Sequence, residues 1–322
     1  MVMLLKLLAD GRFHSGQALG AALGVSRSAV WKQLQQLEAD LGVVVHKVRG
    51  RGYRLEVPIS LLDSTRLAAE LAQLPGPQWE VQLFDTIDST NAEALRQIEA
   101  GRSAPFLILA ERQTAGRGRR GRNWVSPYGV NLYYSLVLRV EGGMRKLEGL
   151  SLVVGLAVRS ALADMGIEGA GLKWPNDVLV AGQKIAGILL ELVGDPADVC
   201  HVVIGVGINV NMRDAAEIDQ QWTSMQLLSK AVVDRNVLVT SLCNSLRSYL
   251  SQHDAHGFSA LKEQWEQAHA WQGRLVSLVS GSRVIEGQVV GIDKQGALRM
   301  LVEGKEQVFS GGELSLRLKH DS

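Results

Sequence analysis

Apolar residues along the first part of the chain recur at helical spacing, and serine and glycine residues interrupt them. Residues 1–9 predict a first amphipathic helix, and Ser15 is placed to cap a second helix that ends just before Gly24. Ser26 then predicts the start of a third helix. This helix carries one apolar stripe, formed by Val30, Leu34, Leu37 and Leu41. Two short helices joined by such a tight turn are the helix-turn-helix pattern, whose second helix enters the major groove of DNA.

A basic hairpin is predicted directly after these helices. Residues 43–45 and 53–55 are strand-like, and the glycine-rich stretch 49–52 between them carries two arginines. Residues 1–56 hold eight basic and four acidic side chains, although the whole chain has a net charge of only +1. We therefore expect a winged helix-turn-helix that binds DNA; the alternative is a generic helical subdomain with a solvated basic face. The candidate DNA-binding residues are Ser26, Arg27, Ser28, Lys32, Arg49 and Arg51.

Beyond Pro58 strands and helices are mixed, without a regular alternation of the two. The predicted helices cover residues 60–74, 90–100 and 147–165, and the predicted strands cover residues 80–86, 106–111, 132–138, 177–180, 185–192 and 202–209. The short separations between these strands favour an α+β fold, in which a mixed sheet has its helices to one side. Four or five short strands follow at 275–279, 283–292, 297–302 and 307–309, which predicts a small β-barrel. The predicted domains are residues 1–59, 60–270 and 271–322.

The composition is that of a globular protein with more than one domain. The chain has 322 residues, of which 46% are hydrophobic and 21% charged. No apolar stretch reaches the roughly 18 residues needed to cross a bilayer. The two cysteines, Cys200 and Cys243, support neither a disulfide framework nor a zinc site, so a cytoplasmic location is expected. The glycine motifs of Rossmann and P-loop nucleotide sites do not occur.

The strongest local signal is the stretch from Gly116 to Arg122, with three glycines and four arginines in seven residues. The glycines permit a close approach of backbone N–H groups to a ligand, and the arginines supply donors suited to phosphate and carboxylate. A nucleic-acid-binding tract or a solvated loop is the alternative. The position between two predicted core strands, beside Trp124, favours an anion-binding loop of a compact domain.

Further motifs point to a small-molecule site, although each has an ordinary structural explanation. Residues 88–91 place short polar side chains where a strand meets a helix, which is also a common helix cap. Residues 173–177 gather a lysine, an amide and a carboxylate around a proline turn, and such oxygens suit Mg²⁺. Lys184 begins a strongly apolar run, so its ammonium is predicted to end in a cleft; the alternative is an ordinary strand-end lysine whose ammonium reaches the solvent. Residues 205–209 place two glycines in one strand, where a ligand or another backbone comes close.

Five motifs of this chain, taken in order, resemble those of the biotin protein ligases. They are D-S-T-N, G-R-G-R-R-G-R-x-W, K-W-P-N-D, K-I-A-G-I-L and G-I-N-V-N. With the helix-turn-helix, the chain is similar to the bifunctional form, which also represses the biotin operon. The likeness runs from about Phe13 to the C-terminus and is densest at 85–210. The resemblance implies a winged helix-turn-helix, a mixed-sheet catalytic domain like that of biotin and lipoate ligases, and a C-terminal SH3-like barrel.

The resemblance also implies an activity. Such ligases use ATP with Mg²⁺ to convert biotin to biotinyl-5′-AMP, and then transfer biotin to a lysine of the biotin carboxyl carrier protein. In the bifunctional form, biotinyl-5′-AMP is the corepressor that favours a homodimer on operator DNA. No membrane partner is expected.

By the same resemblance, Lys184, Arg117 and Arg119 would be catalytic. The biotin-binding residues would be Ser89, Thr90, Asn91, Gln113, Arg117, Gly118, Arg119, Trp124, Lys184, Gly205 and Gly207. The ATP-binding residues would be Arg119, Arg120, Asn176, Asp177, Asn209 and Arg317, with Trp222 packing on adenine. Asp177 and Asn209 would be the Mg²⁺ ligands.

Two other functions stay open. One is a repressor that senses biotin without catalysis. The chain keeps Lys184, Asp177 and the stretch from Gly116 to Arg122, called the arginine loop below, and this argues against such a repressor. A lipoate-type acyl ligase is more distant, because the Arg-Gly loop and the winged helix both favour the biotin enzymes. Asn123 departs from the family pattern, since a basic residue is expected before Trp124.

Overall fold

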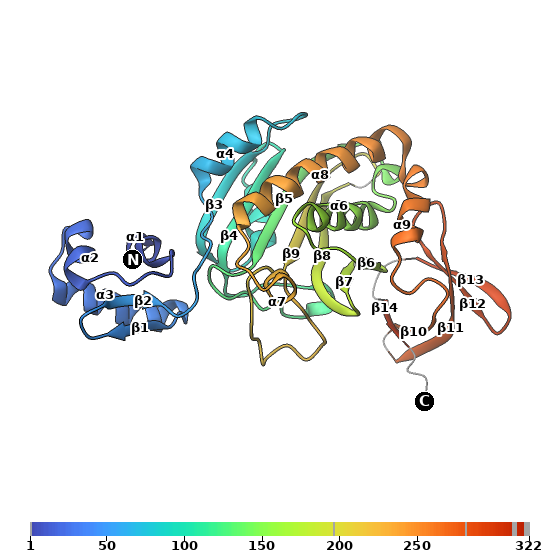
Figure 1. The fold of residues 1–322 in the computed structure, drawn as a ribbon. Coiled ribbons are helices and arrows are strands. Elements are labelled where there is room, and N and C mark those ends of the chain that lie inside the picture. Colours follow the sequence, from blue (N-terminus) through green and yellow to red (C-terminus); the bar gives the residue numbers. More distant parts are fainter. Residues whose placement is uncertain (1, 196, 281, 311–313, 319–322) are drawn as a thin grey trace.

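The computed structural model describes residues 2–195, 197–280, 282–310 and 314–318. Figure 1 shows the N-terminal helices at one end of the molecule, the large sheet in the middle and the C-terminal strands at the other end. Among the described residues, no helix is long and apolar enough to cross a membrane. The last residues of the predicted third domain, 319–322, lie outside the described part of the chain.

The N-terminal unit is a helix-turn-helix with a wing. Its elements are α1 (Val2–Leu8), α2 (Gly16–Leu23), α3 (Arg27–Leu41), β1 (Val45–Val48) and β2 (Gly52–Leu55). Both predicted caps are confirmed: the Ser15 hydroxyl accepts from the Ala18 amide at 3.0 Å, and the Ser26 hydroxyl accepts from the Ala29 amide at 3.2 Å. Of the predicted stripe on α3, all but Leu41 are fully buried. The wing is antiparallel as expected, but its first strand begins at Val45 rather than at residue 43.

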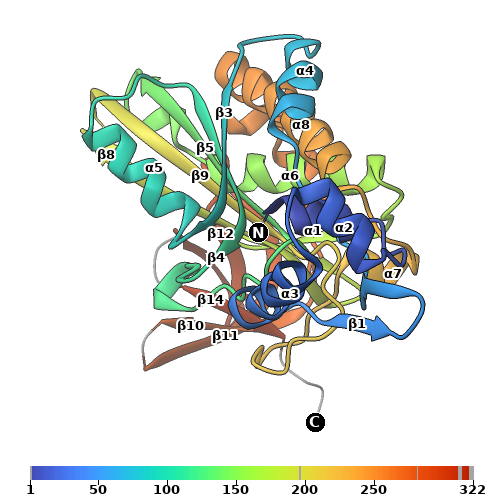
Figure 2. The same cartoon turned by 90° about the vertical axis from the view of Figure 1, so that its left-hand side faces the viewer.

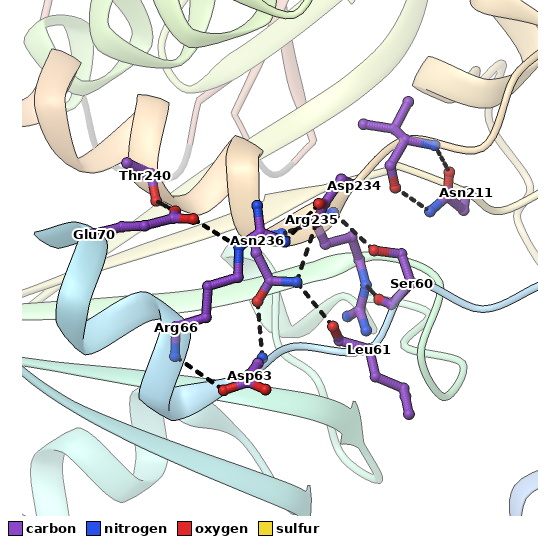
Figure 3. Close-up of polar contacts among 11 residues, drawn as sticks. Ser60, Leu61, Asp63, Arg66, Glu70, Asn211, Asp234, Arg235, Asn236 and Thr240 are labelled. Carbon is purple, nitrogen blue, oxygen red and sulfur yellow. Dashed lines mark hydrogen bonds and ion pairs between the residues drawn. The ribbon is translucent and has the colours of Figure 1, made fainter. Parts of the chain in front are cut away.

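The linker to the central domain is extended before it becomes helical. The helix predicted from residue 60 begins only at Ser64, as α4 (Ser64–Ala72), with Asp63 as its N-cap. Figure 3 shows the reason: the start of α8 (Arg235–His256) binds the linker backbone. The Arg235 Nε donates to the Ser60 carbonyl at 2.6 Å, and the Asn236 Nδ2 donates to the Leu61 carbonyl at 2.9 Å. Residues 60–63 are therefore held in an extended conformation.

The central domain is built on a mixed sheet. In the described part of the chain it has seven strands in the order β3-β4-β5-β9-β8-β7-β6, of which only β3 and β4 run parallel. The strands are β3 (Glu80–Ile87), β4 (Phe106–Gln113), β5 (Leu132–Glu141), β6 (Ala170–Lys173), β7 (Asp177–Val180), β8 (Gln183–Gly194) and β9 (Val199–Ile208). The predicted strands are all present, and β6 is an addition.

Helices cover both faces of this sheet, so the prediction of helices to one side is wrong. The helices α4, α6 (Leu150–Asp164) and α8 pack over one face, and α5 (Thr90–Glu99) packs on the other (Figure 2). The side chains of β4 show why: Leu107 and Leu109 belong to the main core, whereas Phe106 and Ile108 pack with Ala94 of α5. A strand that is apolar at every position needs cover on both faces.

The region after residue 211 contributes helices that the sequence did not predict. They are α7 (Met225–Ser229), α8 and α9 (Lys262–Ala268). The C-terminal sheet is wholly antiparallel, in the order β13-β12-β11-β10-β14. Its strands are β10 (Leu275–Ser280), β11 (Arg283–Ile292), β12 (Leu298–Val302), β13 (Lys305–Phe309) and β14 (Ser315–Leu318). Its apolar residues are continuous with the main core, so this domain is packed directly against the central one.

Candidate active site and DNA-binding face

Two adjoining cavities lie between strands β8 and β9 and the loop that joins β4 to β5. The larger has a volume of about 310 Å³ and the smaller about 60 Å³. The residues that line both are Gly118, Arg119, Trp124, Asn176 and Lys184. Lys184 and the arginine loop thus stand where the two cavities meet, as a site that joins two substrates requires.

The smaller cavity brings together every residue that the sequence predicted for biotin. These are Ser89, Thr90, Asn91, Gln113, Arg117, Gly118, Arg119, Trp124, Lys184, Gly205 and Gly207. They come from α5, β4, the arginine loop, β8 and β9, which are separated by up to 118 positions in the chain. The structure therefore places the predicted set around one hollow.

Polar side chains at one end of the smaller cavity are buried and bonded to one another. Ser89 is the N-cap of α5, and Thr90 and Asn91 are its first residues, each at most 4% exposed. The Gln113 Oε1 accepts from the Thr90 amide at 2.8 Å, and the Gln113 Nε2 donates to the Ser126 hydroxyl at 3.0 Å. Buried polar groups in fixed orientations discriminate between ligands by their donors and acceptors.

Two glycines on β9 make room for the side chains of the cavity. A Cβ atom on Gly207 would lie 2.5 Å from the Trp124 ring, and one on Gly205 would overlap the Asn91 amide. Strand β9 therefore has to carry a bare backbone where the indole and the amide pack. Trp124 in turn covers Gly187 of β8, so its ring forms a wall of both cavities.

The four arginines of the arginine loop have different surroundings. Arg117 forms an ion pair with Glu191 of β8 at 3.2 Å, and the Arg119 Nη1 donates to the Asn176 Oδ1 at 3.0 Å. Burial lowers the pKa of the Arg119 guanidinium. Arg120 has a left-handed backbone with φ of 60° and an exposed side chain, whereas Arg122 lines the larger cavity. An anion entering here would relieve the cost of holding the Arg119 cation away from water.

Lys184 belongs to a compact cluster of charges at the wall of the larger cavity. Its Nζ lies 2.7 Å from the Asp177 Oδ1 and 5.4 Å from the centre of the Trp124 ring. The Lys173 Nζ lies 3.5 Å from the other oxygen of Asp177. Burial lowers the pKa of the Lys173 ammonium, and the carboxylate opposes that shift. With two cations for one carboxylate, the cluster keeps a net positive charge for a phosphate or carboxylate ligand.

The predicted metal ligands do not form a closed metal site by themselves. The Asn209 Nδ2 donates to the carbonyls of Thr223 at 3.0 Å and Lys184 at 3.4 Å, and Asp177 is engaged by the two lysines. Across the residues that the structure describes, no group of three His, Cys, Asp or Glu side chains could hold a metal ion. A single carboxylate next to a phosphate site nevertheless suits Mg²⁺, which usually combines one or two carboxylates with substrate oxygens and water.

The larger cavity receives some of the residues predicted for ATP. Asn176, Asp177, Asn209, Arg119 and Trp222 line it. Arg317 of β14 has an exposed side chain, while its neighbours Ser315 and Leu316 contribute to the lining. The sequence analysis did not assign Lys173, Arg122 or the segment 217–220, which also line this cavity. Lys173 carried a signal, because it belongs to the K-W-P-N-D motif, whereas segment 217–220 offered none.

The predicted DNA-binding residues lie exposed on the helix-turn-helix and its wing. Arg27, Ser28 and Lys32 are on α3 behind the cap Ser26. The tip arginines Arg49 and Arg51 join the two wing strands, and the Arg51 guanidinium lies 4.4 Å from the centre of the Phe13 ring. This stacking fixes one basic side chain of the wing in place.

Comparisons with known proteins agree with this site. The model of the Biotin/lipoate A/B protein ligase family matches residues 83–209, an HTH domain model matches 3–54, and the Biotin protein ligase C terminal domain matches 273–317. The Bifunctional ligase/repressor BirA of Escherichia coli (strain K12) and that of Salmonella typhimurium (strain LT2) are each 42% identical over 316 residues, covering 98% of this chain and 96% of each relative. The biotin protein ligase of Aquifex aeolicus in complex with biotin and ATP superposes with a TM-score of 0.66 at 32% identity, covering 74% of this chain and 99% of that one.

The fold and the paired cavities define a ligase class, and the chain belongs to the biotin protein ligase family. Within this family its layout is that of the bifunctional ligase/repressors, since the helix-turn-helix, the ligase domain and the C-terminal domain follow one another. The biotin–[acetyl-CoA-carboxylase] ligase of Paracoccus denitrificans is 38% identical and covers only 70% of this chain, over 233 residues.

Proposed function

We propose that this protein activates biotin with ATP to biotinyl-5′-AMP and then transfers biotin to a lysine of the biotin carboxyl carrier protein. The observation that carries the proposal is the pair of adjoining cavities with Lys184 at their junction. Biotin would occupy the smaller cavity, with its ureido ring against Ser89, Thr90, Asn91 and Gln113. ATP would occupy the larger cavity.

The first step joins two anions, because the biotin carboxylate attacks the α-phosphate and pyrophosphate leaves. Cations fixed beside the reacting groups reduce the repulsion. Lys184 would bridge the carboxylate and the α-phosphate, and Arg117 and Arg119 would hold the carboxylate and the nucleotide. Asn176, Asp177 and Asn209 would face the phosphates, while Arg120 and Arg317 would need to turn toward them from their exposed positions. Trp124 would cover the biotin side chain, and Trp222 would pack on adenine.

ATP would bring Mg²⁺ with it, and the ion would neutralise phosphate charge next to Asp177. In the second step, the carrier lysine amine attacks the acyl carbon of the adenylate, the bond to the AMP oxygen breaks, and an amide forms. No side chain of the ligase itself acts as a nucleophile. Both steps are expected to take place in the cytoplasm.

The N-terminal domain would bind operator DNA through α3 and the wing. A helix-turn-helix protein binds two half-sites as a dimer. We therefore infer a homodimer that biotinyl-5′-AMP stabilises, with the adenylate acting as corepressor. A ligand shifts such an equilibrium only by its different affinity for the two states.

The test is the biotin-dependent exchange of labelled pyrophosphate into ATP, with lipoate as the control acid. We expect exchange with biotin and none with lipoate. Tight biotin binding without exchange would overturn the ligase and leave the alternative, a catalytically silent repressor that senses biotin. Exchange with lipoate instead would make the chain a lipoate-type ligase.

A further inference from the structure

Glu191 of β8 is not among the residues that line the smaller cavity, but it contacts two residues that are. From this strand, the cavity lining takes Lys184 and residues 187–189. Glu191 lies further along β8, and its Oε2 is 2.7 Å from the Asn91 Nδ2 and 3.2 Å from the Arg117 Nη2. A single carboxylate therefore touches one residue of the polar end of the cavity and one residue of the arginine loop.

We propose that Glu191 is a positioning residue that orients the Asn91 amide, so that Asn91 offers biotin a hydrogen-bond acceptor. The inference rests on the proposed function, since it assigns the smaller cavity to the ureido ring. By size alone, an asparagine amide fits equally well with its oxygen and nitrogen exchanged. The neighbouring groups decide which way it points.

An ionised carboxylate accepts hydrogen bonds and donates none. The Asn91 Nδ2 therefore has to face Glu191, and its second proton points at the Leu189 carbonyl, 3.4 Å away. The Asn91 Oδ1 then accepts from the Ser135 hydroxyl at 2.6 Å and retains one free lone pair. Because both amide protons are engaged, Asn91 can add only an N–H donor as partner. The two ureido nitrogens of biotin carry such donors.

The contacts around Glu191 form a closed circuit. The Ser135 Oγ also lies 2.8 Å from the Thr90 Oγ1, which lies 3.1 Å from the Gln113 Oε1. Because the one proton of Ser135 goes to Asn91, the Thr90 hydroxyl donates across one of these two contacts. Gln113 donates to Ser126, whose hydroxyl donates to the Trp124 carbonyl at 2.8 Å. Trp124 follows the arginine loop by two residues. The loop returns to Glu191 through Arg117. The polar end of the cavity and the loop thus share one carboxylate.

The two contacts of Glu191 differ in strength. Ser135 is fully buried and Asn91 is 4% exposed, so the amide is held in a site without water. The Arg117 side chain is 44% exposed, and exposed ion pairs contribute little. Arg117 can therefore leave Glu191 for the carboxylate of biotin, while Asn91 stays in place.

The experiment measures selectivity rather than affinity alone. Full-length protein is titrated calorimetrically, without ATP, with biotin and with biotin methylated on a ureido nitrogen. In Glu191→Ala the amide loses its acceptor, and we expect the preference for biotin over the methylated form to fall by about tenfold, the size of one hydrogen bond to a charged group. Glu191→Gln keeps an acceptor and is expected to keep the preference within about twofold. Glu168→Ala, an exposed carboxylate that lines neither cavity, is the matched control.

Each outcome decides the question. An equal loss of affinity for both ligands in Glu191→Ala would show a merely structural role and overturn the proposal. A loss of preference in Glu191→Gln as large as in the alanine variant would also overturn it, because the acceptor would not be what matters. If the unaltered protein failed to bind biotin at all, the proposed function itself would fall, and this inference with it.

Discussion

At the scale of single residues, Lys184 is one of the five residues that line both cavities. Its ammonium lies 2.7 Å from Asp177, and its side chain is 16% exposed, so it is held in place yet accessible to a ligand. We expect Lys184→Ala to fold normally and to slow biotin-dependent pyrophosphate exchange by about 10²–10³-fold, as is typical when one group that stabilises a developing charge is removed. Lys294→Ala, an exposed lysine in a turn of the C-terminal domain, should exchange like the unaltered protein. Near-normal exchange in Lys184→Ala would remove Lys184 from the mechanism.

The sequence motifs and the family resemblance that rests on them predicted eleven residues that line the smaller cavity, because each motif is local and rich in polar groups or glycine. Tyr133 and Tyr134 of β5, which also line it, were not predicted. The motifs were less informative where the direction of a side chain depends on the fold. Arg120 lies in the same motif as Arg119, but its left-handed backbone accompanies an exposed side chain. Glu191 could not be found from the sequence, since its contact with Asn91 joins residues 100 positions apart.

At the scale of elements, the wing carries its basic residues at an exposed tip. Arg49 and Arg51 stand between β1 and β2, and each phosphate contact that is lost reduces the salt dependence of binding by about one unit. We expect Arg49→Ala with Arg51→Ala to weaken operator binding and to flatten the slope of log K against log salt by about two units. The matched control is Arg274→Ala with Arg283→Ala, which removes the same charge from the C-terminal domain. An unchanged slope in the wing variant would mean that the wing does not touch phosphates.

The pattern of hydrophobic residues predicted the strands of the central sheet more completely than the helices that follow residue 211. The strands of the central sheet are short apolar runs between turn residues, and each except β6 was predicted. Helix α8 was not, although it has 22 residues. Its buried face includes Arg235, Asn236, Arg247 and His253, so polar residues interrupt the apolar stripe that a sequence pattern relies on. These residues are paired by distant backbone groups, as with Arg247, whose guanidinium donates to the carbonyl of Leu74 at 2.9 Å.

At the scale of the whole molecule, one buried ion pair joins the linker, the sheet and α8. Arg235 is fully buried and forms an ion pair with Glu111 of β4. It also donates to the carbonyls of Ser60 at 2.6 Å and Asn131 at 2.9 Å, while the Glu111 Oε1 accepts from the Leu62 amide at 2.7 Å. The linker behind the winged helix is thereby bonded to the ligase domain on both sides. Glu111 and Gln113 both lie on β4, and Gln113 lines the smaller cavity. Strand β4 therefore connects the buried ion pair with the cavity.

Removing one partner of this pair would leave the other charge buried without compensation. We expect Arg235→Met to lower the free energy of unfolding by about 3–5 kcal/mol. The double variant Arg235→Met with Glu111→Gln is expected to regain part of this loss, because the unpaired carboxylate is replaced by a neutral amide.

The control is Arg66→Met in the same region (Figure 3). Arg66 also forms two ion pairs, with Glu70 at 2.6 Å and Asp234 at 2.7 Å, but it is 41% exposed and should cost less than about 1 kcal/mol. Urea denaturation measures all three variants. If Arg235→Met were no more costly than Arg66→Met, the linker would not depend on this pair. The described contacts that attach the winged helix to the ligase domain would then include its apolar contact with Tyr128 and the hydrogen bond from the Arg112 guanidinium to the Asp40 carbonyl.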